Sequence, residues 1–115
     1  MIESDLATYL EQYITVPITV GKRLPETDDS VVIFSVGSLL SNAWASQLDQ
    51  LQISVRATEP DKVSDLVETI VSNIKGFYGL LGQERVTLFI NSITGDIYED
   101  DGRIVHRAIL VNLKR

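Results

Sequence analysis

Cysteine is absent from the 115-residue sequence, and histidine occurs once, at His106. The missing thiols exclude disulfide bonds, thiolate zinc sites and a cysteine nucleophile. A single imidazole cannot supply a histidine pair to a metal ion, and no GxSxG motif provides a serine nucleophile. Because His106 lies among apolar residues, we interpret it as a structural imidazole whose hydrogen bonds are satisfied. We therefore expect a protein that is not an enzyme and that binds no cofactor or metal ion.

Long apolar runs and basic clusters are also missing. The apolar runs span only a few residues, far from the roughly 20 that a membrane helix requires. The N-terminal sequence MIESDLATYL lacks the basic and apolar regions of a secretory signal. Sixteen acidic and ten basic residues give a net charge of -6, and no stretch gathers Lys and Arg into a phosphate-binding patch. We expect one soluble domain, residues 1–115, with no affinity for membranes and no specific binding of DNA.

The clearest pattern lies between Leu51 and Gly76, where the apolar spacing changes from that of a strand to that of a helix. In residues 51–57, apolar and polar side chains alternate, which is typical of a half-buried strand. Helical spacing then places six apolar side chains on one stripe: Val63, Leu66, Val67, Ile70, Val71 and Ile74. Pro60 suits the first turn and Gly76 the left-handed cap, so we predict a long amphipathic helix over about 60–75. It needs a sheet beneath it, because an isolated stripe cannot offset its own ordering entropy.

The remaining elements predict an α+β fold. An N-terminal helix is expected over about 3–14, with Ser4 as a candidate cap. The other expected strands are residues 18–20, 31–36, 84–93 and 103–113. Residues 76–82, GFYGLLG, are interpreted as a connection, because they lack the Gly-Lys-Ser/Thr ending of a phosphate loop. The predicted sheet is mixed, mostly antiparallel and of about four to five strands, with the long helix on one face.

Two groups of apolar residues are candidates for an oligomer or partner interface. Residues 37–46 fit no period, yet they contain Leu39, Leu40 and the single tryptophan, Trp44. These side chains either fold back over the core of the domain or meet a partner, where Trp is enriched. The second face of the sheet is more apolar than a solvated face should be, and we expect the first helix or a neighbouring subunit to cover it. The residues of this second group are Phe34, Phe89, Ile93 and Leu110.

The turn of the last predicted hairpin carries a run of acidic residues. It contains Asp96, Glu99, Asp100 and Asp101. A calcium loop starting at Asp96 would place Tyr98 third, Asp101 at the glycine position and Arg107 where a bidentate Glu belongs, so the pattern fails. Paired catalytic carboxylates would need burial that an exposed turn does not give. We interpret the run as a solvated turn, with an electrostatic role as the alternative.

The order of the elements resembles that of the tail-terminator and minor capsid (tail-completion) proteins of long-tailed bacteriophages. The resemblance is carried by an N-terminal helix, the strand VVIFSVG, a strand ending in VRA, the helix DKVSDLVETIVSNIKG and the final hairpin segment DDGRIVHRAILVNL. It covers nearly the whole chain. No invariant motif or catalytic residue belongs to it.

The resemblance implies a structural virion protein of the tail-neck region, made in the host cytoplasm. Such a protein would form a ring, a hexamer, that caps the tail tube, ends its polymerisation and offers the surface that joins the head. Its partners would be further copies of itself, the tail tube protein and a head-completion protein. DNA would pass through the ring without specific binding, and the 96–101 run would repel phosphates if it lines the lumen. The alternatives are a head-completion or stopper protein and a stand-alone regulatory α+β module.

Overall fold

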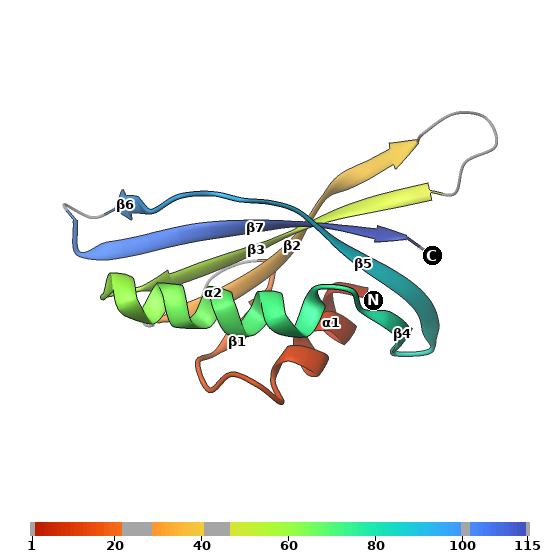
Figure 1. The fold of residues 1–115 in the computed structure, drawn as a ribbon, viewed down its shortest axis with the longest axis horizontal. Helices are drawn as coiled ribbons and strands as arrows, with labels where there is room; N and C mark the ends of the chain where they lie inside the picture. Colours follow the sequence, from red (N-terminus) through yellow and green to blue (C-terminus); the bar gives the residue numbers. More distant parts are fainter. Residues whose placement is uncertain (1, 22–28, 41–46, 100–101, 115) are drawn as a thin grey trace.

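The structure is a computed structural model that describes residues 2–21, 29–40, 47–99 and 102–114. These ranges hold two helices, α1 and α2, and one sheet of seven strands (Figure 1). The elements are α1 (Ile2–Leu10), β1 (Ile18–Val20), β2 (Ser30–Leu40), β3 (Gln47–Ala57), α2 (Pro60–Ile74), β4 (Tyr78–Leu81), β5 (Glu84–Ile93), β6 (Ile97–Glu99) and β7 (Ile104–Lys114). The α+β class is confirmed. The expectation of four to five strands was too low.

The strand order is β1-β2-β3-β7-β5-β4, and β6 pairs with β7 beyond the end of β5. β1 runs parallel to β2, whereas the other pairs are antiparallel. β5 and β6 both pair with β7, one after the other along the same side of that strand. Thr94 lies between them, and its N–H donates to the carbonyl of Ala108 at 3.0 Å. The mostly antiparallel sheet that the sequence predicts is therefore present, with β3 and β7 at its centre.

The strand and helix predicted around residues 51–76 are confirmed. The alternate apolar residues of β3, from Leu51 to Ala57, are buried. α2 begins at Pro60, and its buried stripe consists of Val63, Val67, Ile70 and Ile74. The helix ends as expected, since Gly76 has a φ of 74° in the left-handed region that glycine tolerates best.

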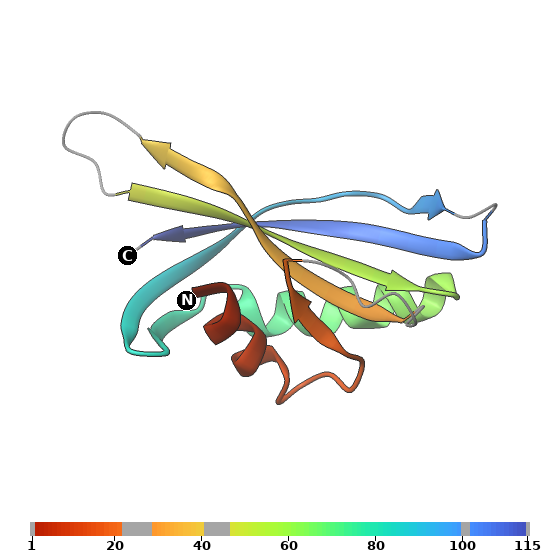
Figure 2. The same cartoon turned by 180° about the vertical axis from the view of Figure 1, so that it is seen from behind.

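Both helices pack on the same face of the sheet, below it in Figure 1 and again in the reverse view of Figure 2. One core joins Leu6 and Leu10 of α1 to the stripe of α2 and to the inward residues of β2, β3, β5 and β7. Of the two covers expected for the second face, the first helix or a neighbouring subunit, the first helix is therefore wrong. Tyr9 explains the placement, because its ring contacts Phe77 and its hydroxyl donates to the carbonyl of Asn73 at 3.0 Å.

Two strands were missed in segments interpreted as a connection and a turn. Residues 78–81 form β4, which pairs with residues 84–87 of β5. Gly82 starts the tight turn between them with a φ of 63°. Residues 97–99 form β6, whose partners in β7 are residues 104–106. Glycines and acidic residues lower strand propensity, but pairing with a long neighbouring strand outweighs that preference.

Three boundaries also differ from the predictions. α1 ends at Leu10 rather than near residue 14, and its residue Ser4 is no cap; the carbonyl of Ser4 accepts a bond from the Thr8 hydroxyl at 3.0 Å. β2 continues through residues 37–40, which were interpreted as irregular, and β3 begins at Gln47. The two strands form a long hairpin whose far end projects beyond the helices (Figure 1). The described helices include none long and apolar enough to span a membrane.

Candidate interaction surfaces

Exposed apolar side chains are concentrated on the strands at one lateral edge of the sheet, beyond β7. In the described ranges, eight large hydrophobic residues are exposed, and six of them belong to β4, β5 or β6. These six are Tyr78, Leu80, Phe89, Ile93, Ile97 and Tyr98. A monomeric soluble protein has little reason to concentrate such residues, so this side of the sheet is a candidate interface.

The backbone of β5 is unpaired along this side. β4 covers β5 only as far as Thr87, and Leu88 donates its N–H to the carbonyl of Phe77 at 3.0 Å. Because the backbone N–H and C=O groups of successive residues in a strand point to alternate sides, those of Ile90 point away from β7, as those of Leu88 do. In the part of the chain that the structure describes, no strand pairs with residues 89–93 of β5 on the side away from β7. We call this stretch the β5 edge.

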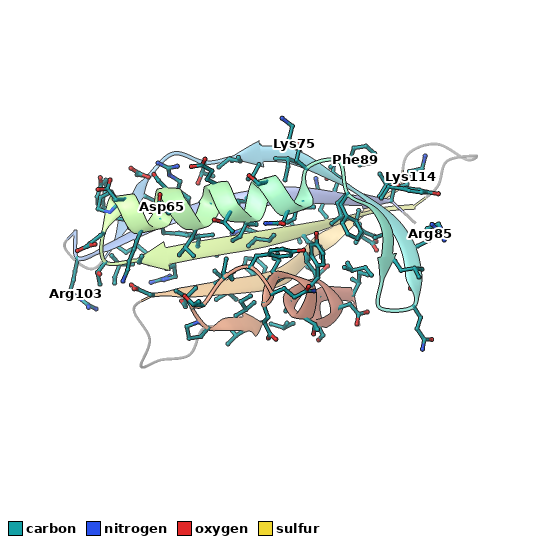
Figure 3. The ribbon with its side chains drawn as sticks, turned by 60° about the horizontal axis from the view of Figure 1, so that its bottom comes forward. Asp65, Lys75, Arg85, Phe89, Arg103 and Lys114 are labelled. Carbon is teal, nitrogen blue, oxygen red and sulfur yellow. The ribbon has the colours of Figure 1, made fainter. Side chains whose placement is uncertain are left out.

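A groove of about 430 Å³ runs between the β5 edge and the end of α2. Its walls are mainly apolar, with Lys75 at the end of α2. Figure 3, seen from the helix side, shows Phe89 and Lys75 at this end of α2. The lining residues are Val71, Lys75, Gly76, Thr87, Leu88, Phe89, Ile90 and Ile93. The groove can take apolar side chains whose backbone pairs with the strand.

A second unpaired edge lies on the opposite side of the sheet. β1 pairs with β2 only over residues 31–33. Among the described residues no strand pairs with residues 34–40 of β2 on the side of β1, and we call this stretch the β2 edge. A bulge between Ser35 and Gly37 leaves Val36 unpaired in the hairpin, and Val36 is 50% exposed.

The interface residues predicted on the second face have mixed outcomes. Phe34 and Leu110 are half-buried on the sheet face opposite the two helices. They lie in one row across the sheet, because each of them is paired with Gln52 of β3. Phe89 is 48% exposed at the edge of this face. Ile93 was placed on the wrong face: a bulge between Ile90 and Ser92 shifts the register, and Ile93 lies opposite the buried core residue Ile109.

Other predicted residues cannot be placed. Trp44 lies outside the described residues, as do Asp100 and Asp101. Leu39 and Leu40 belong to β2, but their side chains are outside the described part of the structure. Their assignment to an interface stays a prediction.

Two carboxylates of the acidic run have cationic partners. Asp96 accepts a hydrogen bond from the Nε of Arg107. Glu99 lies 3.0 Å from Arg56 Nη2 and 3.4 Å from Nδ1 of His106. Because each carboxylate is partly neutralised, these two residues contribute less to a repulsive field than the sequence suggests.

His106 forms fewer hydrogen bonds than predicted. Its Nε2 is buried and has no hydrogen-bond partner, and the same is true of Arg56 Nε and Glu99 Oε1. Burial lowers the pKa of His106, with Glu99 opposing and Arg56 adding to the shift. Burial thus favours the neutral form of the imidazole. In the described ranges no three His, Cys, Asp or Glu side chains are grouped to hold a metal ion.

Comparisons with known proteins give a single kind of match. A scan of the sequence against family models finds none, and a search of curated proteins finds none either. A chain in a structure described as "Virion of native gene transfer agent (GTA) particle" superposes on this chain with a TM-score of 0.67. The match covers 95% of this chain and 82% of that chain, at 11% sequence identity. The two chains share a fold. At this identity the likeness concerns the fold alone.

Proposed function

We infer that the chain is a structural protein of a phage-like virion, and that it forms a ring that caps the tail tube. The observation that carries the proposal is the fold shared with a virion chain over 95% of this sequence. The ring, the end of tube polymerisation and the head-joining surface come from the element order described above. The protein would then lie in the tail-neck region of the virion.

The surfaces of the molecule support an assembling protein. A head-to-tail ring needs two different contact surfaces on each subunit. The β5 edge with its groove and the β2 edge lie on opposite sides of the sheet. The β5 edge exposes Phe89 and Ile93, and the β2 edge exposes Val36. We also propose that the protein is not an enzyme.

Charge supports passage of DNA rather than its capture. The net charge of -6 disfavours tight contact with phosphates. Asp96 and Glu99 are ion-paired, so the repulsion would come from the whole subunit rather than from these two carboxylates. The position of the 96–101 run at the lumen is part of the proposal.

Native mass spectrometry of the full chain over a range of concentrations tests the ring. The expected result is a closed species of about six subunits, which a head-to-tail contact generates when its rotation closes. The measurement is repeated after addition of tail tubes, because the tube itself could nucleate the ring. A protein that stays monomeric or dimeric in both conditions would overturn the proposal and favour a stand-alone module. A ring that ignores tubes but binds the head portal would favour a stopper protein.

A further inference from the structure

We propose that neighbouring copies of this chain join by pairing the β2 edge of one copy with the β5 edge of the next. The sheet of one subunit would then continue into the sheet of its neighbour. The proposal deepens the proposed function, because it names the surfaces that close the ring. The occupant of the groove beside β5 is thus a second copy of this chain, contributing Val36 and the strand around it.

The first argument concerns charged residues and prolines, which both edges lack. Monomeric proteins blunt free edges with charges or prolines, since an unpaired strand attracts another strand. Residues 30–48, which include β2, contain no charged residue and no proline. Residues 86–95, which include the β5 edge, contain none either. Each edge does contain one bulge, but two edges without charge or proline in one small domain favour pairing of both in the working assembly.

The second argument concerns geometry. In the order β1-β2-β3-β7-β5-β4, the two edges lie on opposite sides of one sheet. Pairing unlike edges is heterologous, so each added copy offers the next free edge and the series can close into a ring. Pairing like edges would be isologous and would stop at a dimer.

The third argument concerns the side chains beside each edge. Strand addition takes its affinity from the backbone hydrogen bonds and its specificity from pockets for alternate side chains. The groove along the β5 edge is such a pocket, with Phe89 and Ile93 exposed in its wall. Val36 stands 50% exposed on the partner edge and is a suitable apolar occupant.

Cysteine cross-linking tests the contact, because the natural chain contains no cysteine. Val36→Cys protein is mixed with a size-tagged Ile93→Cys protein and treated with a short bifunctional thiol reagent. The expected product is a cross-linked pair with one tag, formed in the mixture but in neither protein alone. Tyr13→Cys replaces Val36→Cys in the control, because Tyr13 is 45% exposed, close to the 50% of Val36, yet belongs to neither edge. A chain that carries both Val36→Cys and Ile93→Cys should give a series of cross-linked oligomers, up to the closed ring.

Charge insertion gives a second, independent readout. Ile93→Lys places a charge in the groove and should abolish the ring, whereas Tyr13→Lys should leave the ring intact. Thermal melting of both variants checks that each is folded. Cross-links between two Ile93→Cys copies would overturn the proposal by showing an isologous contact. A yield no higher than that of the Tyr13 control would overturn it by showing no contact.

These outcomes are separable from those of the proposed function. A ring that caps tubes but cross-links elsewhere refutes the edge pairing and leaves the proposed function standing. A ring that cross-links through Val36 and Ile93 but ignores tubes refutes the tail-capping function and leaves the edge pairing standing.

Discussion

Substitution of Gly82 by alanine tests how closely α1 approaches the β4–β5 turn. Gly82 has a φ of 63°, and a left-handed conformation costs a non-glycine residue about 1–2 kcal/mol. An added Cβ would also lie 2.5 Å from Oδ2 of Asp5 in α1, well inside van der Waals contact. Because Cγ of Asp5 would lie only 2.6 Å away as well, we expect the whole side chain to move to another χ1 rotamer, at a further cost of about 1 kcal/mol. Gly82→Ala should therefore destabilise the fold by about 2–3 kcal/mol.

Chemical denaturation of single and double variants separates the two contributions. Gly102→Ala is the matched control, since Gly102 has a φ of 85° but no atom within 4 Å of an added Cβ. It should show the backbone cost alone. Removal of the carboxylate by Asp5→Ala should reduce the cost of Gly82→Ala to that of the control, as a double-mutant cycle measures. Equal costs for Gly82→Ala with and without Asp5 would refute the close approach of α1 to the turn.

Three further predictions concern the core, the helix contact and pH. Ile70→Ala should cost about 2–5 kcal/mol in a denaturant titration, because Ile70 is fully buried, whereas Leu80→Ala at an exposed site should cost less than about 0.5 kcal/mol. A loss above 1 kcal/mol at Leu80 would contradict its exposure. Tyr9→Phe should cost about 0.5–1.5 kcal/mol through the lost bond to the carbonyl of Asn73, and no loss by calorimetry would refute that bond. His106 has a folded pKa below its unfolded value of 6.5, so the unfolded state binds protons first and stability should fall as the pH drops below 6.5. His106→Gln should flatten this part of the profile, and an unchanged slope would refute the assignment.

The sequence was most informative where the spacing of apolar side chains agreed with the residues that mark the ends of an element. The stripe of α2 and the alternation of β3 were both visible, and Pro60 and Gly76 mark the limits of the helix as expected. Burial of one face by apolar side chains is a strong constraint on a strand, because a shift of one residue reverses the face. These parts of the fold were therefore predictable from the sequence.

Long-range pairing explains what was missed. β4 and β6 are short, and their strand state depends on β5 and β7 rather than on their own residues. The face of Ile93 was mistaken because the bulge near Asn91 has no clear mark in the sequence. The partners of Asp96 and Glu99 come from distant positions, Arg107 and Arg56 among them. Such pairs depend on register, which local patterns do not contain.

The candidate surfaces were only partly predictable. The sequence indicated an excess of apolar residues, and the prediction placed the interface mainly on the second face and on residues 37–46. The structure adds the β5 edge, which depends on where β4 stops. One signal was present in the sequence: the uncharged, proline-free segments at residues 30–48 and 86–95. Their importance becomes clear only when topology shows both to be edges.

The most direct test of the tail-capping function is electron microscopy of growing tail tubes in the presence of gold-labelled protein. The tube protein of the same virion is allowed to polymerise with increasing amounts of this chain. We predict gold at one end of each tube and a tube length that stops increasing once the ends are occupied. Gold along the sides of the tubes, or tubes that keep growing at saturating protein, would contradict the proposed function.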